Sequence, residues 1–269
     1  MTKSRQTYPT DLNCTEREQL AKFFPASSRG RPRKWEVWVI LNAIVYVNRT
    51  GCQWRMLPVN FPPWQTVYGY FWRWTRTGVW EQINAELVRL ARQRAGRHPQ
   101  PSAGSIDSQS VKTSEGGEAR GVDVHKQTSG RKRHIVVDTL GLLLVVLVHS
   151  AGIPDGSGGK LVLQRLFERI KRNVHNRWCR LKVLWADGAY KDSVDYVRQH
   201  FGWTLDIVRR PKAAKGFRVL PRRWVVERSF GWFGRYRRLA RDFEHRTISS
   251  EAMVYLASIR RTLKLATTK

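Results

Sequence analysis

Hydrophobic and polar positions recur with two different periods along this chain, and the period changes near residue 100. Before that point apolar residues recur at helical spacing, as in residues 35–48, where Trp35, Val39, Leu41 and Val45 are apolar. We therefore expect the front part of the chain to be helical. The expected helices are one that begins at the capping-box pair Thr15 and Glu18 and ends near Phe24, then 35–48, 65–76 and 79–94.

After residue 104 short apolar runs alternate with helical patterns. Residues 132–138 and 142–149 are apolar runs joined by Thr139-Leu140-Gly141, which predicts a hairpin. The full order of elements predicts an α/β fold in which helices flank a mixed sheet. The other expected strands are 105–112, 181–186 and 205–209, and the expected helices are 161–172, 193–200, one that begins at Pro221 and carries Glu227, and 251–265.

The segment between these two parts is rich in Pro, Gly and small residues. It reads AGRHPQPSAG over residues 95–104, a composition typical of a linker. We therefore expect a small all-α domain over residues 1–95, a linker over 96–104 and an α/β domain over 105–269.

The charge of the chain is strongly unbalanced, with 49 Lys and Arg against 21 Asp and Glu. A net charge of +28 predicts a nucleic-acid or anionic-membrane partner. Basic residues are spread along the chain, and no apolar run is long enough to span a membrane, so we expect DNA and no membrane. We also expect a cytoplasmic, nucleoid-associated protein whose scattered cysteines, Cys14, Cys52 and Cys179, are free thiols.

Three acidic residues occupy positions that suit a metal centre. Glu227 is the only acidic residue between Arg209 and Arg241, a segment that contains twelve Lys or Arg. Asp107 lies inside the first expected strand, and Asp187 follows a buried strand, where sites in α/β sheets collect. Three such carboxylates suit a pair of hard divalent ions. The pattern alone also allows a turn role for Asp187 and an ion pair for Glu227.

Four motifs follow one another along the second part of the chain. They are Asp107-Ser-Gln-Ser-Val-Lys-Thr, Gly130-Arg-Lys-Arg-His-Ile-Val-Val-Asp-Thr-Leu-Gly, Trp185-Ala-Asp-Gly-Ala-Tyr and Arg223-Trp-Val-Val-Glu-Arg-Ser-Phe. Together they resemble bacterial insertion-sequence transposases of the DDE superfamily, in the insertion sequence five family, and the resemblance covers nearly the whole chain. It implies a ribonuclease-H-like catalytic core behind a helical DNA-binding domain. It also implies that Asp107, Asp187 and Glu227 are the catalytic triad and bind two Mg²⁺ ions, with Mn²⁺ as a substitute.

The chain departs from a signature of these transposases. The signature is Tyr, two residues, Arg, three residues, Glu, six residues and Lys, and its Tyr and Lys hold phosphates at the DNA ends. Arg223 and Glu227 fit this signature, whereas Leu220 and Gly234 stand at the Tyr and Lys positions. We expect Arg223 to contact phosphate and the neighbouring Arg235 to replace the Lys.

Other basic residues are candidates for phosphate contacts, with a solvated loop as the alternative. They lie in the segment RGRPRKW, in the connection 125–134 and beside Glu227. One front helix is expected to read DNA as part of a helix-turn-helix. The aromatic run 68–74 is expected to pack in the core, and Asp155 is a candidate auxiliary residue. The complete set of expected DNA contacts is Arg31, Arg33, Lys34, Lys126, Arg131, Lys132, Arg223, Arg228 and Arg235.

The expected activity is that of a DNA transposase. It would cleave the ends of an insertion sequence at the terminal inverted repeats, leave a 3′-OH, and transfer that end into target DNA. Two ends must be joined together, so at least a homodimer is expected on DNA. Two alternatives remain: a related metal-dependent nuclease or resolvase that does not join strands, and an inactive DNA-binding descendant of a transposase.

Overall fold

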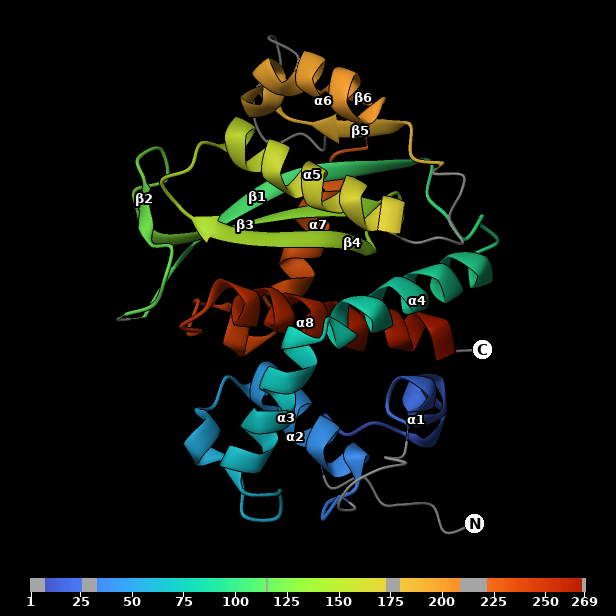
Figure 1. Cartoon of the computed structure of the whole chain (residues 1–269), viewed down its shortest axis with the longest axis vertical. Coiled ribbons are helices and arrows are strands. Elements are labelled where there is room, and N and C mark those ends of the chain that lie inside the picture. The colour runs from blue at the N-terminus through green and yellow to red at the C-terminus, as the bar shows by residue number, and fades with distance from the viewer. Residues whose placement is uncertain (1–7, 26–32, 115, 173–179, 209–221, 268–269) are drawn as a thin grey trace.

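The computed structural model of the protein describes residues 8–25, 33–114, 116–172, 180–208 and 222–267. A mixed sheet and its covering helices form one half of the molecule, and a group of helices forms the other half (Figure 1). Within the described residues, no helix is both long enough and apolar enough to cross a membrane.

The sheet has the expected mixed topology. Its central strand β1 is antiparallel to β3 and parallel to β5, and β5 is parallel to β6. β4 forms a hairpin with β3, and the short β2 pairs with the start of β3. The order β4–β3–β1–β5–β6 is ribonuclease-H-like, so the predicted fold class is confirmed. The strands are β1 (Ala103–Lys112), β2 (Gly121–Asp123), β3 (Thr128–Asp138), β4 (Leu143–Ser150), β5 (Val183–Ala186) and β6 (Thr204–Ile207).

Helices cover both faces of the sheet. On one face, Ile106 and Val136 pack in a cluster with Leu163 and Val197 of the covering helices. The other face contributes residues such as Val137 to a second cluster. The first face is covered by α5 (Asp155–Arg172) and α6 (Val194–Phe201), and the second by α7 (Trp224–Phe233) and α8 (Thr247–Thr267).

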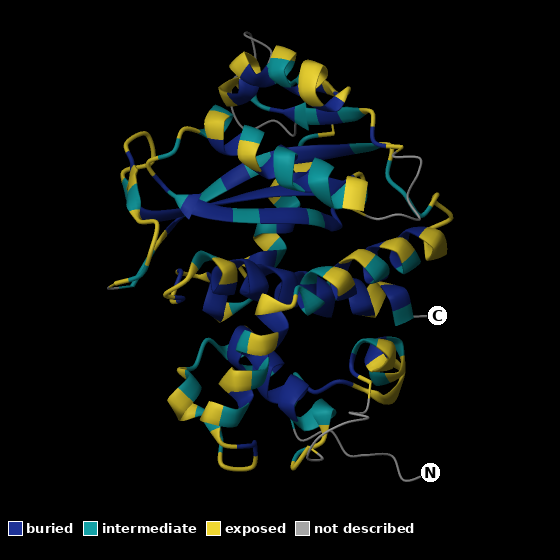
Figure 2. Ribbon diagram, viewed as in Figure 1, coloured by how far each residue is buried: buried dark blue, intermediate teal, exposed yellow. Residues whose placement is uncertain are grey.

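The front helices pack on α8, which is buried along most of its length (Figure 2). Their apolar residues belong to the same cluster as Val137, so one core connects them to the sheet through α8. The loop between α4 and β1 coincides with the expected linker, and the division into two domains stays a prediction. The front helices are α1 (Cys14–Leu20), α2 (Val37–Thr50), α3 (Trp64–Arg76) and α4 (Val79–Arg94).

The aromatic run 68–74 packs in this core as predicted. Phe71 is fully buried, and the Trp74 ring lies 4.7 Å from that of Phe24 and 5.5 Å from that of Trp80. Cys14 and Cys52 are free thiols, and Cys179 lies outside the described residues.

The structure corrects three local predictions. The helix that carries Glu227 begins at Trp224 and not at Pro221. The first helix is capped by Asn13, whose Oδ1 accepts from the Glu16 amide at 2.9 Å, and not by the pair Thr15 and Glu18. Asn is as good an N-cap as Thr, so the residue type alone does not choose between the two positions. Helix α5 begins at Asp155, earlier than the expected residue 161, because the Gly-rich segment that resembles a loop is helical and packs closely against its neighbours.

Candidate active site

Three carboxylates meet on the face of the sheet that α7 covers. Asp107 lies in the middle of β1, and Asp187 directly follows β5. The parallel pairing of Ser105 with Trp185 brings the end of β5 beside Asp107. Glu227 lies in the first turn of α7, which packs against β1. Residues distant in the sequence therefore converge at one point of the sheet.

The side chain of Arg223 lies between these carboxylates. Its Nη2 atom is 3.3 Å from Asp107 Oδ2, 3.4 Å from Asp187 Oδ2 and 3.4 Å from Glu227 Oε1. Arg223 is the N-cap residue of α7 and precedes Glu227 by four residues, which places both side chains on one helical face. One cationic group thus bridges all three acidic side chains.

The backbone just before Arg223 has an unusual conformation. Arg222 adopts a left-handed conformation with φ of 69°, which is uncommon for a residue with a Cβ. Its carbonyl accepts a hydrogen bond of 2.9 Å from Ser105 Oγ on β1. Ser105 therefore ties the start of α7 to the strand that carries Asp107. Sequence reasoning missed Ser105, because a serine in a strand carries no signal of this contact.

Each aspartate uses one oxygen locally and presents the other to Arg223. Asp107 Oδ1 accepts from the Ser108 amide at 2.7 Å. Asp187 Oδ1 accepts from the Ala189 amide at 2.9 Å and caps the 3₁₀ turn Gly188–Ser193. Asp187 is therefore a turn residue and a member of the cluster at once, so the two interpretations of its position are compatible.

Asp107 and Arg223 are more deeply buried than Glu227. Burial raises the pKa of Asp107, and Arg223 opposes that rise. Burial alone would lower the pKa of Arg223, but the surrounding carboxylates outweigh it and raise that pKa, which keeps the guanidinium charged. The side chains of Asp107 and Arg223 are 15% exposed and that of Glu227 is 49% exposed, so the site opens to solvent beside Glu227.

Asp155, the auxiliary candidate, lies on the opposite face of the sheet. Its Oδ1 accepts from Ser108 Oγ at 2.8 Å and lies 2.9 Å from Lys132 Nζ. Burial would raise the pKa of Asp155, but these contacts outweigh it and lower that pKa. Tyr190 is buried on the same side, and burial and then the charges of Asp107 and Asp155 raise its pKa. Asp155 thus contacts β1 from the opposite face of the sheet and is not part of the carboxylate cluster.

The donor set fits a divalent ion. Among the described residues, no group of three or more His, Cys, Asp and Glu side chains is arranged to hold a metal ion as it stands. The guanidinium of Arg223 separates the three carboxylates, and its ion pairs show that they already surround a positive charge. An all-oxygen set suits Mg²⁺ or Mn²⁺. An ion held by these three side chains would take the place of the Arg223 guanidinium.

Four of the expected DNA contacts lie on the surface. Arg33, Lys34, Lys126 and Arg235 are exposed, and Arg33 donates to the carbonyl of Pro25 at 2.9 Å. Arg31 lies outside the described residues.

Two others are buried, and a third, Arg228, is half-buried and contacts its neighbours. Arg131 is fully buried and donates to the carbonyls of Glu118, Glu244 and His245. Lys132 is buried between Asp123 and Asp155. Both belong to β3, which begins at Thr128, so they are strand residues and not part of an exposed connection. Arg228 donates to the Leu140 carbonyl at 3.1 Å and stacks on Trp224 and Trp232.

Known proteins resemble this chain over both of its parts. Residues 98–260 match the family described as "Transposase DDE domain", and residues 15–84 match "Putative transposase of IS4/5 family". The "Uncharacterized protein y4sN" of Sinorhizobium fredii (strain NBRC 101917 / NGR234) is 29% identical over 75 residues, which are 28% of this chain and 60% of that protein. The chain thus covers less than two thirds of that relative.

A solved structure was also matched. It is the "Crystal structure of the Mos1 mariner paired end complex with Mn", at 13% identity over 93% of this chain and 82% of that chain. The TM-score is 0.29, which is too low to carry an argument.

Proposed function

This chain belongs to the family of DDE-domain transposases, which cut and join DNA with divalent metal ions, and we propose that it is the transposase of an insertion sequence. The observation that carries the proposal is the convergence of Asp107, Asp187 and Glu227 on one cationic group, in a chain with a net charge of +28. A strongly basic protein with such a carboxylate cluster suits phosphodiester chemistry on DNA.

The proposed catalytic triad is Asp107, Asp187 and Glu227, which would hold two Mg²⁺ ions or, as a substitute, Mn²⁺. When bound, these ions activate a water molecule or a hydroxyl group and neutralise charge at the leaving oxygen. Asp107 and Asp187 are fixed by backbone hydrogen bonds, so they would orient the ions, whereas the more exposed Glu227 would face the substrate. Arg223 would leave the carboxylates and bind a DNA phosphate.

The proposed reaction has two displacements at phosphorus. At an element end, water attacks the phosphodiester and the bond to the 3′ oxygen breaks, which leaves a 3′-OH and a 5′-phosphate. That 3′-OH then attacks a phosphodiester of the target and displaces the target's own 3′ oxygen, so one bond forms for each bond broken. The protein contributes by holding the reacting groups in line and stabilising the charge that develops.

The proposed partners are the double-stranded inverted repeats and the target DNA. Two element ends must be held together, so we propose a homodimer or larger assembly on DNA. A cytoplasmic, nucleoid-associated location is part of this proposal, because the substrate is chromosomal DNA. The proposed surface contacts to phosphate are Arg33, Lys34, Lys126 and Arg235, together with Arg31.

The test uses the full chain, Mg²⁺ or Mn²⁺, and a plasmid that carries the gene with its native flanks. New 3′ ends and joined molecules are mapped at nucleotide resolution. Glu227→Gln and Asp187→Asn should each lower cleavage and joining at least about a hundredfold, because a ligand of the proposed ions is lost, and should leave DNA binding in EDTA unchanged. Asp206→Asn, on an exposed position of β6, is the matched control and should keep the wild-type rate.

Each alternative predicts a different result. Cleavage without joined products would favour a nuclease or resolvase. DNA binding with neither product would favour an inactive descendant. Cleavage by Asp187→Asn at nearly the wild-type rate would show that the proposed triad is wrong.

A further inference from the structure

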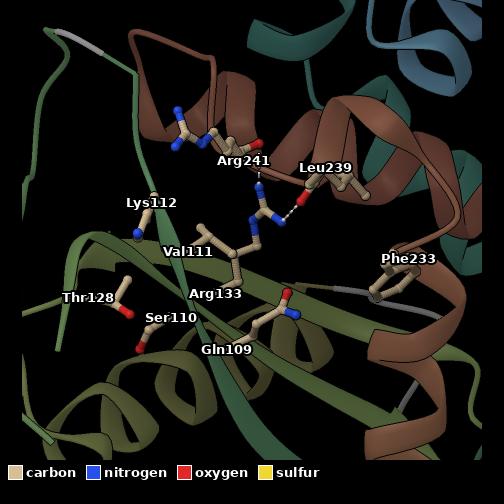
Figure 3. A pocket seen from close by; sticks show the side chains of 11 residues that line it. Gln109, Ser110, Val111, Lys112, Thr128, Arg133, Phe233, Leu239 and Arg241 are labelled. Carbon is tan, nitrogen blue, oxygen red and sulfur yellow. Dashed lines mark hydrogen bonds between the residues drawn. The ribbon is translucent and has the colours of Figure 1, made fainter. Parts of the chain in front are cut away.

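A cavity of about 310 Å³ lies further along β1 than the carboxylate cluster, and Figure 3 shows the residues that line it. Its walls come from the second half of β1, the start of β3, the end of α7 and residues 239–241. Gly234 lies in the wall and contributes no side chain, which leaves space between α7 and the sheet. None of the residues expected to bind DNA lines this cavity, although Gly234 in its wall is the neighbour of Arg235.

The cavity continues the candidate active site along β1. Gln109 lines it and lies two residues after Asp107, so both side chains are on the same face of the strand. Two residues of a strand span about 7 Å. Across the sheet, Gln109 pairs with Arg133 as Asp107 pairs with Ile135. A chain molecule bound at Asp107 and following β1 would therefore reach the cavity.

The residues that line the cavity include three cations and no carboxylate. Lys112 and Arg241 are exposed, whereas Arg133 is 3% exposed. The two acids near Arg133 have other partners: Asp242 pairs with Arg131, and Glu244 with Arg238. The lining of the cavity is therefore positively charged and would attract an anionic ligand.

Arg133 places a fixed positive charge in the wall of the cavity. Its Nη1 and Nη2 donate to the carbonyls of Leu239 and Arg241 at 2.8 and 3.3 Å. These bonds fix the guanidinium in the wall (Figure 3). Its Nε is buried and has no acceptor among the described residues. The charge of the side chain acts on the cavity from its wall, and an anion in the cavity would be attracted to it.

We propose that this cavity binds one nucleotide unit of the DNA strand held at the carboxylates. The phosphate lies against Lys112, Arg133 and Arg241, and the sugar lies against Val111 and Phe233. A volume near 300 Å³ is at the lower end for ligand pockets and much larger than a bare phosphate needs. DNA as the ligand rests on the proposed function, and the cavity adds a phosphate subsite next to the reacting phosphate.

The test measures DNA binding in EDTA, so that it does not depend on metal or chemistry. The probe is a fluorescently labelled duplex with one end of the gene's native flanking DNA, and the dissociation constant is measured over a range of salt concentrations. Each phosphate contact contributes about 0.9 to the slope of log affinity against log salt. Arg241→Ala should reduce the magnitude of that slope by about 0.9.

A variant that fills the cavity without changing its charge makes the test specific. Ala240→Trp, at an exposed position in the wall, should reduce the slope by about the same amount as Arg241→Ala, because it excludes the phosphate. The double variant should lose no more than either single one. Thr128→Trp fills the cavity from the opposite wall and replaces Ala240→Trp if that variant melts early. Arg198→Ala, exposed on α6, is the control and should keep the wild-type slope.

Two results would overturn the proposal. The first is a wild-type slope in both tryptophan variants, which would mean that Arg241 acts only as a surface charge. The second is binding of inorganic phosphate that Ala240→Trp abolishes while DNA binding stays at the wild-type level, which would assign the cavity to a free anion. Failure of metal-dependent cleavage in the wild type would defeat the proposed function alone, because the slopes are measured without metal.

Discussion

Arg223 occupies the position that a bound cation would take between the three carboxylates. Its ion pairs offset part of the negative charge of Asp107, Asp187 and Glu227, which repel one another at close range. A metal ion at the proposed triad would therefore compete with an internal cation. If Arg223 moves to a DNA phosphate, metal binding and DNA binding become coupled, and each strengthens the other.

The first prediction concerns this competition. Arg223→Ala should bind Mn²⁺ roughly tenfold more tightly than the wild type in the absence of DNA, because three ion pairs worth up to about 1 kcal/mol each no longer have to be broken. Isothermal titration calorimetry measures the change. Arg235→Ala removes an equal charge from an exposed position and should bind Mn²⁺ as the wild type does. Unchanged or weaker binding by Arg223→Ala would show that Arg223 does not compete.

At this scale the sequence predicts some residues and misses others for physical reasons. Asp107, Asp187 and Glu227 stand in recognisable motifs, and the structure brings them together. Arg131 and Lys132 look like surface charges, because a run of cations is usually solvated. Their burial depends on the pairing of β3 with β1 and β4, which no local pattern contains.

At the scale of the elements, α5 packs closely against its neighbours because it has glycines at the contact. A Cβ on Gly158 would lie 2.6 Å from His134 Cε1 and 2.6 Å from His149 Nε2. Those histidines are buried beneath the helix and share a hydrogen bond of 2.7 Å, and burial and then His149 lower the pKa of His134 to about 3. The neutral pair therefore has little room to move.

The second prediction tests this close contact. Gly158→Ala should lower the free energy of unfolding by about 1–3 kcal/mol, since the added methyl forces the helix off the sheet. Gly69→Ala in α3, where a Cβ meets nothing within 4 Å, is the matched control and should raise stability by about 0.5–1 kcal/mol. Urea denaturation compares the two. Equal effects of both substitutions would contradict the proposed role of Gly158.

The elements themselves are largely predictable. Residues 79–94 form α4 with the expected bounds, because a strong helical period is uninterrupted there. The start of α5 is not predictable from propensity, since three glycines disfavour a helix that tertiary contacts nonetheless hold. The three-residue β2 is too short to give a pattern and exists through its pairing with β3.

In the whole molecule, α8 connects the front helices to the sheet. Asn84 of α4 is fully buried, donates to the Leu143 carbonyl at 2.7 Å and accepts from Ser258 of α8 at 2.8 Å. Arg92 of α4 pairs with the buried Asp138 of β3. Polar and apolar contacts thus link both parts, although the composition of residues 95–104 suggests separate domains.

The third prediction follows from this shared core. Leu256→Ala in α8 should cost about 2–5 kcal/mol and lower protection of α4 and β3 together, since one cavity weakens the cluster that both contact. Hydrogen exchange followed by mass spectrometry reports on each element. Leu265→Ala removes an exposed leucine of the same helix and should have little effect. Loss of protection in α4 alone would indicate domains that unfold separately.

Whole-molecule properties divide in the same way. The net charge predicts a DNA partner, and the order of the motifs predicts the fold class. Charge and motif order can both be read directly from the sequence. The path of α8 between two layers is not predictable, since its apolar spacing would suit a helix against either one. Long-range contacts decide that placement.

The position of α8 in the chain also sets an order of events during synthesis. The ribosome delivers the front helices first, and the helix that covers their apolar faces is made only after the whole sheet has emerged. Until then the nascent chain exposes the apolar faces of its front helices. A polypeptide interrupted before residue 247 would lack the helix that connects both parts of the core and would be a substrate for chaperones and proteases.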